Sequence, residues 1–377
     1  MSAPLPPDCE VGPDVEIEAA QIEVGPGCRI GISDGDDFRT PPGVRIRVRR
    51  LVLGAGVQIG RSVRIEGGEI RLDDGVRVLR HSTINVAEEL HIGAGGTLGE
   101  SCEISGRRVR IGQELWMLPG AKIGGGSAFE RDSLLDAGHF LHLGVQSLVN
   151  TARPVRIGNE VGLGTRTSIY THGAYPSRLM GFPVAFDGVE IGDHTWVPGA
   201  VINPGVRIGR NCVIGVNSLV SGDIPDGALA AGSPAKVIKE GAYPRPLSPE
   251  GRRAFFTEFL DGYARILGTD DRTDAADGRV QLRAEGTRYV AVFGDGVGEA
   301  GDAQAGGERT VLIGETPAAD GDGVTVLDTG ARRARGVADA ASDRLTNELR
   351  RHGIRFYSRP RDGRYVDWGE PAPFLLP

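Results

Sequence analysis

Aliphatic residues recur every six positions along most of the first 240 residues of the chain. They fall at Leu72, Val78, Ile84 and Leu90, at Ile111, Met117, Ile123 and Phe129, and at Ile202, Ile208, Ile214 and Val220. Apolar residues recur about every 3.6 positions in an amphipathic helix and every 2 positions in a half-buried strand, so a spacing of six fits neither. Six fits a short strand plus a turn, with one aliphatic side chain of each unit pointing inward. Three such units close a coil, and stacked coils pair their strands in parallel about 4.8 Å apart.

A small or turn-forming residue often follows the aliphatic position, as Gly158, Gly192 and Gly215 do. Glycine suits a corner, where the backbone needs positive φ or a close approach. Traces of the six-residue repeat reach back to Val11. The repeat therefore predicts a mainly β fold, a parallel β-helix over residues 1–240. The period alone does not give its handedness, because parallel crossovers are otherwise right-handed in about 98% of cases.

The six-residue repeat is interrupted in the stretch "IYTHGAYPSRLMGFPVAFDGVEIG" from Ile169 to Gly192. If every six-residue unit is a wall segment, the residues 172–188 must leave the β-helix as a loop. Surface loops accept insertions cheaply, so tolerance alone explains such a loop. Loops on rigid scaffolds also carry function, and His172 stands at the root of this one, where the wall holds its backbone.

The six-residue repeat ends after Lys239, and a helix is predicted in the segment 241–268. Ser248 provides an N-cap with Pro249 at the first helical position, and Gly268 closes the helix. We expect its apolar face to pack on the β-helix or on a neighbouring subunit. A polar linker (269–278) then leads to a small α/β or α+β domain (279–377). Its strand candidates include "RYVAVFG", "TVLIGE", "VTVLDT" and "IRFYSR", with a helix from about Val337 to His352.

The bulk composition excludes several function classes. A net charge of −7 leaves no basic field to hold nucleic acid. No apolar run reaches the roughly 18–20 residues of a membrane helix, and the first residues lack the charged and apolar regions of a signal peptide. The four cysteines (Cys9, Cys28, Cys102, Cys212) show no metal-like spacing and are interpreted as small core residues of a reduced, cytoplasmic protein.

The block Val155–Glu240 carries a specific resemblance. It includes "VRIGNEVGLGTRTSIYTHGAYP" and ends in "GALAAGSPAKVIKE". This block resembles the maltose, galactoside and xenobiotic O-acetyltransferases of the hexapeptide-repeat acyltransferase superfamily. The resemblance implies a left-handed β-helix, acetyl-CoA or another acyl-CoA as co-substrate and a small sugar-like acceptor. It also implies a homotrimer with active sites between subunits, and a cap of the β-helix formed by "GSPAKVI".

The resemblance implies that His172 is the general base. Acyl transfer from a thioester to a hydroxyl requires removal of the acceptor proton as the attack proceeds, and an imidazole does this near neutral pH. Backbone N–H groups of a glycine-rich wall can stabilise the oxyanion. A merely structural histidine is the competing interpretation. His194, in "IGDHTWV", is expected at a corner of the wall instead.

The resemblance also assigns binding roles. Asn150, His142 and Trp196 are expected to contact the acceptor, although His142 could instead fill the β-helix and Trp196 could be a structural aromatic. The acyl-CoA is expected to contact Pro198, Gly199, Val216, Ser218, Ala231, Gly232, Ser233, Lys236 and Lys239. Two departures affect these contacts: Ser221-Gly222 stands where the family often has Thr-Lys, and "WVPGAVINPG" is one residue shorter than usual.

Other functions stay open at this point. One is an N-acyltransferase acting on an amino sugar, and another is a non-catalytic β-helix scaffold whose C-terminal domain recruits a partner. A zinc β-helix enzyme would need His139, His142 and His172 to converge, and their spacing is unsuitable, so no metal is expected. A sugar nucleotidyltransferase is disfavoured, because the six-residue units begin almost at the N-terminus.

Overall fold

The computed structural model describes residues 5–32, 43–274, 279–292, 309–314 and 322–368. The chain divides into two compact units. Of the described residues, those up to Pro244 form the first unit and those from Arg245 onward form the second.

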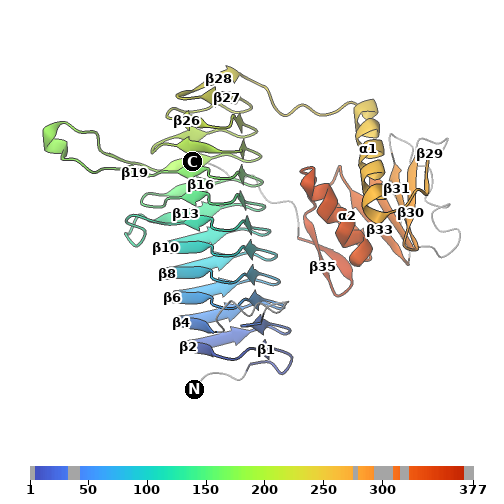
Figure 1. Cartoon of the computed structure of the whole chain (residues 1–377), viewed down its shortest axis with the longest axis horizontal. Coiled ribbons are helices and arrows are strands. Elements are labelled where there is room, and N and C mark those ends of the chain that lie inside the picture. Colours follow the sequence, from blue (N-terminus) through green and yellow to red (C-terminus); the bar gives the residue numbers. More distant parts are fainter. Residues whose placement is uncertain (1–4, 33–42, 275–278, 293–308, 315–321, 369–377) are drawn as a thin grey trace. The chain divides into compact units, whose positions relative to one another are not determined.

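The first unit is a parallel β-helix whose stacked coils build three walls (Figure 1). Wall 1 is one sheet of β1 (Glu10–Val11), β3 (Arg29–Ile30), β5 (Gln58–Ile59), β7 (Arg77–Val78), β9 (Thr97–Leu98), β11 (Trp116–Met117), β14 (His142–Leu143), β17 (Gly162–Leu163), β22 (Trp196–Val197), β25 (Val213–Ile214), β27 (Leu229–Gly232) and β28 (Ala235–Lys239).

Walls 2 and 3 share one long strand in each of the early coils and separate later. The shared strands are β2 (Val15–Val24), β4 (Val44–Leu53), β6 (Arg64–Leu72), β8 (Thr83–Ile92) and β10 (Glu103–Ile111). Wall 2 continues in β12 (Lys122–Ile123), β15 (Leu148–Val149), β18 (Ser168–Ile169), β23 (Ala200–Ile202) and β26 (Ser218–Val220). Wall 3 continues in β13 (Leu134–Ala137), β16 (Val155–Ile157), β21 (Val189–Ile191) and β24 (Arg207–Ile208).

The strand register confirms the repeat that the hydrophobic pattern predicts. Gln58 pairs with Arg77 in the next coil (77 − 58 = 19), and Trp196 pairs with Val213 (213 − 196 = 17), each close to three six-residue units. The repeated aliphatic side chains fill the interior in one continuous cluster, in which Leu72, Val78 and Ile84 are fully buried. The resemblance implies that the coil is left-handed, and this handedness stays an expectation.

The repeat fails at two of the predicted inward positions. Phe129 is 51% exposed, and the neighbouring Ala128 is buried instead. The cause is the glycine turn at Gly124–Gly126, where three successive residues with positive φ shift the phase of the chain. Val11 is 45% exposed, because it lies in β1, which is paired on one side by β3.

The corner between walls 3 and 1 carries a polar ladder that links successive coils. His139 N–H donates to Asn159 Oδ1 (2.9 Å), and Asn159 N–H donates to Asp193 Oδ1 (2.6 Å) in the next coil. His194 also lies at a corner, with positive φ, as predicted. Cys28, Cys102 and Cys212 are buried and unbridged, as expected of small core residues, and burial raises the pKa of each thiol.

The interrupted stretch leaves the β-helix as an arm (Figure 1). β19 (His172–Gly173) pairs antiparallel with β20 (Ala185–Phe186), and the short 3-10 helix η1 (Arg178–Met180) lies between them. The wall resumes at Val189, which pairs with Val155 across the interruption. The β-helix ends in the antiparallel hairpin of β27 and β28, which contains the "GSPAKVI" sequence.

The second unit is a mixed six-stranded sheet with two helices. The strands, in spatial order, are β29 (Arg272–Asp274), β30 (Val280–Ala284), β31 (Thr287–Val292), β32 (Arg309–Gly314), β33 (Val324–Asp328) and β34 (Arg333–Gly336). The helices are α1 (Pro249–Leu267) and α2 (Ala340–Arg351), and β35 (Ser358–Arg361) pairs with β36 (Arg364–Asp367). Ser248 caps α1 by accepting from Gly251 N–H (3.1 Å), as its sequence predicts.

Two sequence expectations for this unit are wrong. The apolar face of α1 packs within its own unit, where Phe259, Leu260 and Tyr263 are buried against Val280 and Leu282. The sheet offers an apolar face to the helix because alternate residues of β30 point to one side. The segment 269–278 is not wholly a linker, since Arg272–Asp274 forms the edge strand β29 by backbone pairing with β30.

Of the helices in the described ranges, none combines the length and the apolar character that crossing a membrane requires.

Candidate functional site

His172 lies at the corner between wall 2 and wall 3, where β18 has just ended. Asn150 occupies the same corner one coil earlier, because Val149 and Ile169 are register partners. His172 Nδ1 lies 3.0 Å from Asn150 Oδ1. Asn150 is 4% exposed, so its amide is held by the protein rather than by solvent. The structure therefore brings together two of the residues singled out in the sequence.

The hydrogen bonds around Asn150 fix the orientation of its amide. Asn150 Nδ2 donates to Gly125 O (2.9 Å), which leaves Oδ1 as the atom facing His172. Ala152 N–H donates to this same oxygen (3.3 Å), and Thr171 Oγ1 lies 2.7 Å from it. An amide oxygen only accepts hydrogen bonds, so Nδ1 of a neutral His172 must carry the hydrogen. Nε2 is then the unprotonated nitrogen and can take a proton from an acceptor.

The turn Gly124–Gly126 forms the floor beneath the imidazole. A Cβ at Gly126 would lie 2.6 Å from Cε1 and 2.9 Å from Nε2 of His172, and Gly126 has φ of +37°. Both facts require glycine there. This turn was not predicted from the sequence, although "GGG" at 124–126 is the only run of three glycines in the chain. Such a run signals a close approach of the backbone to another group.

The arm covers the other side of His172. The ring of Phe186 stacks on the imidazole, with centroids 5.9 Å apart and an interplanar angle of 20°. The guanidinium of Arg153 lies over the Phe186 ring, 4.9 Å from its centroid, and also pairs with Glu130 (3.6 Å). Sequence reasoning also missed Phe186 and Arg153, because the pairing of β19 with β20 that brings them together has no six-residue signature.

The residues expected to bind acyl-CoA gather in one column. It lies at the corner between wall 1 and wall 2, which we call the cofactor corner. Asn217 N–H donates to Gly199 O (2.7 Å) in the preceding coil. Gly232 N–H donates to Ser218 Oγ (3.1 Å), and Ala231 lies against Gly215. The members of this column are Pro198, Gly199, Val216, Ser218, Ala231 and Gly232.

The terminal hairpin places the remaining predicted cofactor residues beside this column. Lys236 is the register partner of Ala231, and Lys239 is the partner of Leu229. Both lysines and Ser233, in the hairpin turn, are exposed. Exposed ammonium groups beside a backbone column suit the phosphates of a nucleotide-bearing thioester.

His142 and Trp196 lie on wall 1, not at the corner of His172. Gly162 separates them in the register, and a Cβ there would lie 2.4 Å from Trp196 Cε3, so the indole covers this glycine. Trp116 makes an edge contact with His142, with ring centroids 5.2 Å apart. Trp116 is 49% exposed and Trp196 is 42% exposed. The structure thus shows an aromatic strip on wall 1 that the sequence indicated only in part.

The three histidines weighed for a zinc site do not converge. His139 lies at the corner between walls 3 and 1, where its Nδ1 accepts from Gln113 N–H (2.9 Å), and burial lowers its pKa. His142 is on wall 1 and His172 on another corner. Across the described residues, no group of three or more His, Cys, Asp or Glu side chains is arranged to hold a metal ion.

Known proteins similar to this chain are acetyltransferases by name. Over 64 residues it is 45% identical to the galactoside O-acetyltransferase of Escherichia coli, and the match covers 17% of this chain and 29% of that protein. Over 87 residues it is 39% identical to the galactoside O-acetyltransferase of Lactococcus lactis, and the match covers 22% of this chain and 42% of that protein. These relatives confirm the resemblance predicted from the sequence. The chain spans less than half the length of the curated relatives it matches.

A solved hexapeptide-repeat acetyltransferase of Vibrio cholerae, in complex with acetyl coenzyme A, is also similar. It is 22% identical, and the match covers 40% of this chain and 70% of that one with a TM-score of 0.27. No protein-family model matches the chain.

Proposed function

We propose that this protein is an acyl-CoA-dependent acyltransferase that O-acetylates a small sugar-like acceptor, with His172 as the general base. The observation that carries the proposal is the hydrogen bond between His172 Nδ1 and Asn150 Oδ1. It leaves Nε2 free to accept a proton, at a corner held rigid by the wall. The names of the sequence relatives support the reaction class, and the sugar-like acceptor comes from them and from the resemblance.

The reaction follows from this arrangement. His172 Nε2 takes the proton of the acceptor hydroxyl while the acceptor oxygen forms a bond to the acyl carbon. The tetrahedral intermediate then collapses, the carbon–sulfur bond breaks, and His172 returns the proton to the leaving sulfur. Asn150 stabilises the charged imidazole by accepting from Nδ1–H throughout. The acyl group passes directly to the acceptor, so the protein forms no covalent intermediate.

The proposed site is shared between two copies of the chain. In one coil, the cofactor corner and the His172 corner are the two edges of wall 2, and about six residues separate them. At about 3.3 Å per residue, these edges lie on the order of 20 Å apart, whereas reacting atoms must approach to about 3 Å. A neighbouring copy must therefore supply the cofactor corner that faces His172. This supports the homotrimer that the resemblance implies.

The arm favours the same assembly. Tyr175 is fully exposed, Leu179 is 97% exposed and Met180 is 76% exposed in a single copy. Apolar side chains gathered on a projecting segment mark an interaction site. We infer that they pack on a neighbouring copy, next to the site to which His172 belongs.

The test combines the full chain with acetyl-CoA, a thiol reagent and a panel of acceptors: maltose, a galactoside, N-acetylglucosamine and glucosamine. We expect thiol release that depends on a sugar hydroxyl, and an O-acetylated product by mass spectrometry. Acetylation of the glucosamine amine alone would instead identify an N-acyltransferase. Absence of both thiol release and calorimetric CoA binding would contradict the proposal and favour the scaffold function.

A further inference from the structure

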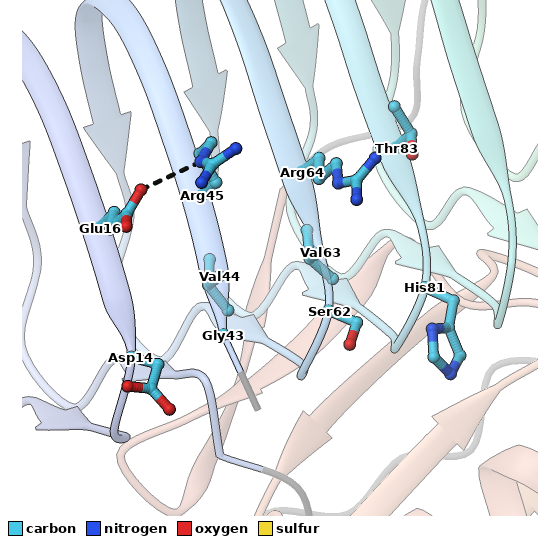
Figure 2. Close-up of a pocket in the computed structure, with 10 residues that line it drawn as sticks. All are labelled: Asp14, Glu16, Gly43, Val44, Arg45, Ser62, Val63, Arg64, His81 and Thr83. Atoms are coloured by element: carbon cyan, nitrogen blue, oxygen red, sulfur yellow. Dashed lines mark hydrogen bonds and ion pairs between the residues drawn. The ribbon is translucent and has the colours of Figure 1, made fainter. Parts of the chain in front are cut away.

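A polar hollow lies in the early coils of the β-helix, on the edge of wall 2 opposite the edge that carries His172. It has a volume of about 550 Å³ and is lined by four successive coils (Figure 2). Each coil gives one corner residue with positive φ, and these four are Asp14, Gly43, Ser62 and His81. The wall residues beside them are Glu16, Arg45, Arg64 and Thr83. A hollow of this volume is within the range that small-molecule ligands occupy.

The charge pattern of wall 2 is interrupted at this hollow. Arginines elsewhere on the outer surface pair with carboxylates in adjacent coils: on wall 3, Arg50 lies between Glu69 (3.0 Å) and Glu23 (2.9 Å). Arg47 likewise pairs with Glu18 (3.3 Å). The ladder through the hollow instead places two arginines next to each other, since Arg45 and Arg64 are direct register partners.

Only one of these two arginines, Arg45, has a carboxylate partner among the described residues. Glu16 pairs with Arg45 (3.0 Å) from the preceding coil, and Figure 2 shows this pair with Arg64 on the next strand. On its other side Arg64 is in register with Thr83, not with an acidic residue. Within the described ranges, no carboxylate forms an ion pair with Arg64. Like charges directly opposite on paired strands are destabilising, so an anion beside Arg64 would relieve a cost that the rest of the face avoids.

The groups around Arg64 suit an oxyanion on a polyhydroxylated molecule. A guanidinium binds a carboxylate or a phosphate through two parallel hydrogen bonds. The hydroxyl of Thr83 and the imidazole of His81 provide further donors at the same end. At the other end, the Asp14 carboxylate can only accept hydrogen bonds, and sugar hydroxyls can donate them.

We propose that this hollow is a second binding site, separate from the acyl-transfer site, for a sugar that carries a carboxylate or a phosphate. The oxyanion binds at Arg64, and the hydroxyls extend toward Asp14. The site lies in the early coils, and five register steps of wall 2 separate Arg64 from Ser168, next to the His172 corner. At about 4.8 Å per step, this is on the order of 24 Å along the axis.

Calorimetric titration tests the site with three probes: glucuronate, glucose 6-phosphate and neutral glucose. We expect at least one anionic probe to bind the full chain at least tenfold more tightly than glucose, and the better probe identifies the source of the oxyanion. Arg64→Gln should weaken that binding at least tenfold. Glu16→Gln should strengthen it, because Arg45 is then released from its ion pair.

Arg49→Gln is the matched control, since Arg49 is an exposed arginine on the same strand outside the hollow. It should bind like the unaltered protein, and so should His172→Ala, which separates this site from the acyl-transfer site. Equal melting temperatures of the variants exclude unfolding as the cause. No binding of either anionic probe at millimolar concentration, or full binding by Arg64→Gln, would overturn the proposal.

Discussion

Asn150 determines which nitrogen of His172 can act as a base. Its amide donates to Gly125 O and presents Oδ1 to Nδ1 of the imidazole. An Asn150→Ala variant loses this acceptor, so the imidazole can rotate or change tautomer. Of all the residues predicted to bind substrate, Asn150 is therefore the one whose contacts imply a positioning role.

Replacement of Asn150 tests this role through the pH profile. We expect Asn150→Ala to lower kcat/KM by about 100-fold, the scale of a general base that is poorly placed. Asn150→Asp should recover part of the rate, because a carboxylate also accepts from Nδ1–H. Its added charge stabilises the protonated imidazole, so the acid limb of the profile should move to higher pH. Asn203→Ala, two coils further along the same ladder, is the control and should leave kcat/KM unchanged.

Gly126 lies beneath the imidazole of His172, where a side chain would collide with the ring. In Gly126→Ala, the new methyl group would lie 2.6 Å from Cε1 of His172 on a backbone with positive φ. The imidazole must move, so we expect a loss of activity of tenfold or more while CoA binding persists. Gly222→Ala, where an added Cβ meets nothing within 4 Å, is the comparison. Equal kcat in both variants would show that the floor of the site does not position the ring.

Among the structural elements, the walls could be predicted from the sequence because one periodic signal specifies them. Each wall strand buries one aliphatic residue, as Ile157, Leu163 and Ile169 do, so the pattern in the chain is the pattern in space. The column of predicted cofactor residues follows from the same period. The environment of His172 does not, because Gly126, Phe186 and Arg153 reach it through a turn and an arm that break the repeat. The packing of α1 was missed for a similar reason, since its partner strands lie later in the chain.

An ion pair in the second unit gives a prediction about stability. Hydrogen bonds from the Arg309 guanidinium (2.7 and 3.1 Å) lower the pKa of Asp339 from 3.8 to about 2, and its capping of α2 through Ser342 N–H adds to this. A carboxyl whose pKa is lower in the folded than in the unfolded protein stabilises the folded state fully when the pH is above the pKa of the unfolded protein. This stabilisation is lost as the pH falls through the pKa of the folded protein. It should therefore be complete above about pH 4 and disappear toward about pH 2.

Urea unfolding of the full chain and of Asp339→Asn measures this contribution. The variant should be less stable at pH 7, and the difference should shrink as the pH falls from about 4 to about 2. Asp362→Asn, at a side chain that is 95% exposed, should differ little from the unaltered protein at any pH. A difference for Asp339→Asn that stays constant down to pH 2 would mean that the ion pair does not account for it.

In the assembled molecule, the proposed mechanism needs two copies of the chain to complete one site. His172 and the cofactor corner lie on opposite edges of wall 2, and no motion within a stack of paired strands closes that separation. The exposed apolar residues of the arm supply a surface through which copies can associate. This sharing could not be predicted from the spacing of residues in the sequence, because it follows from which corner each residue occupies.

Mixed assemblies test the shared site. His172→Ala removes the base, and Val216→Trp blocks the cofactor corner at a side chain that is 63% exposed, so each pure variant should be inactive. If the two are unfolded and refolded together in equal amounts, about a quarter of the sites should combine an intact His172 with an intact corner from a neighbour. Activity near that fraction of the unaltered enzyme is expected. Activity no higher than that of the pure variants would place the whole site in one chain.

The role of His172 as the base is tested by the turnover of His172→Ala with acetyl-CoA and the best acceptor from the panel, measured alongside its CoA affinity. We expect a fall in kcat of about 100- to 10,000-fold, with CoA affinity unchanged, because the imidazole removes a proton and does not bind the cofactor. Turnover close to that of the unaltered protein would contradict the claim that His172 is the base.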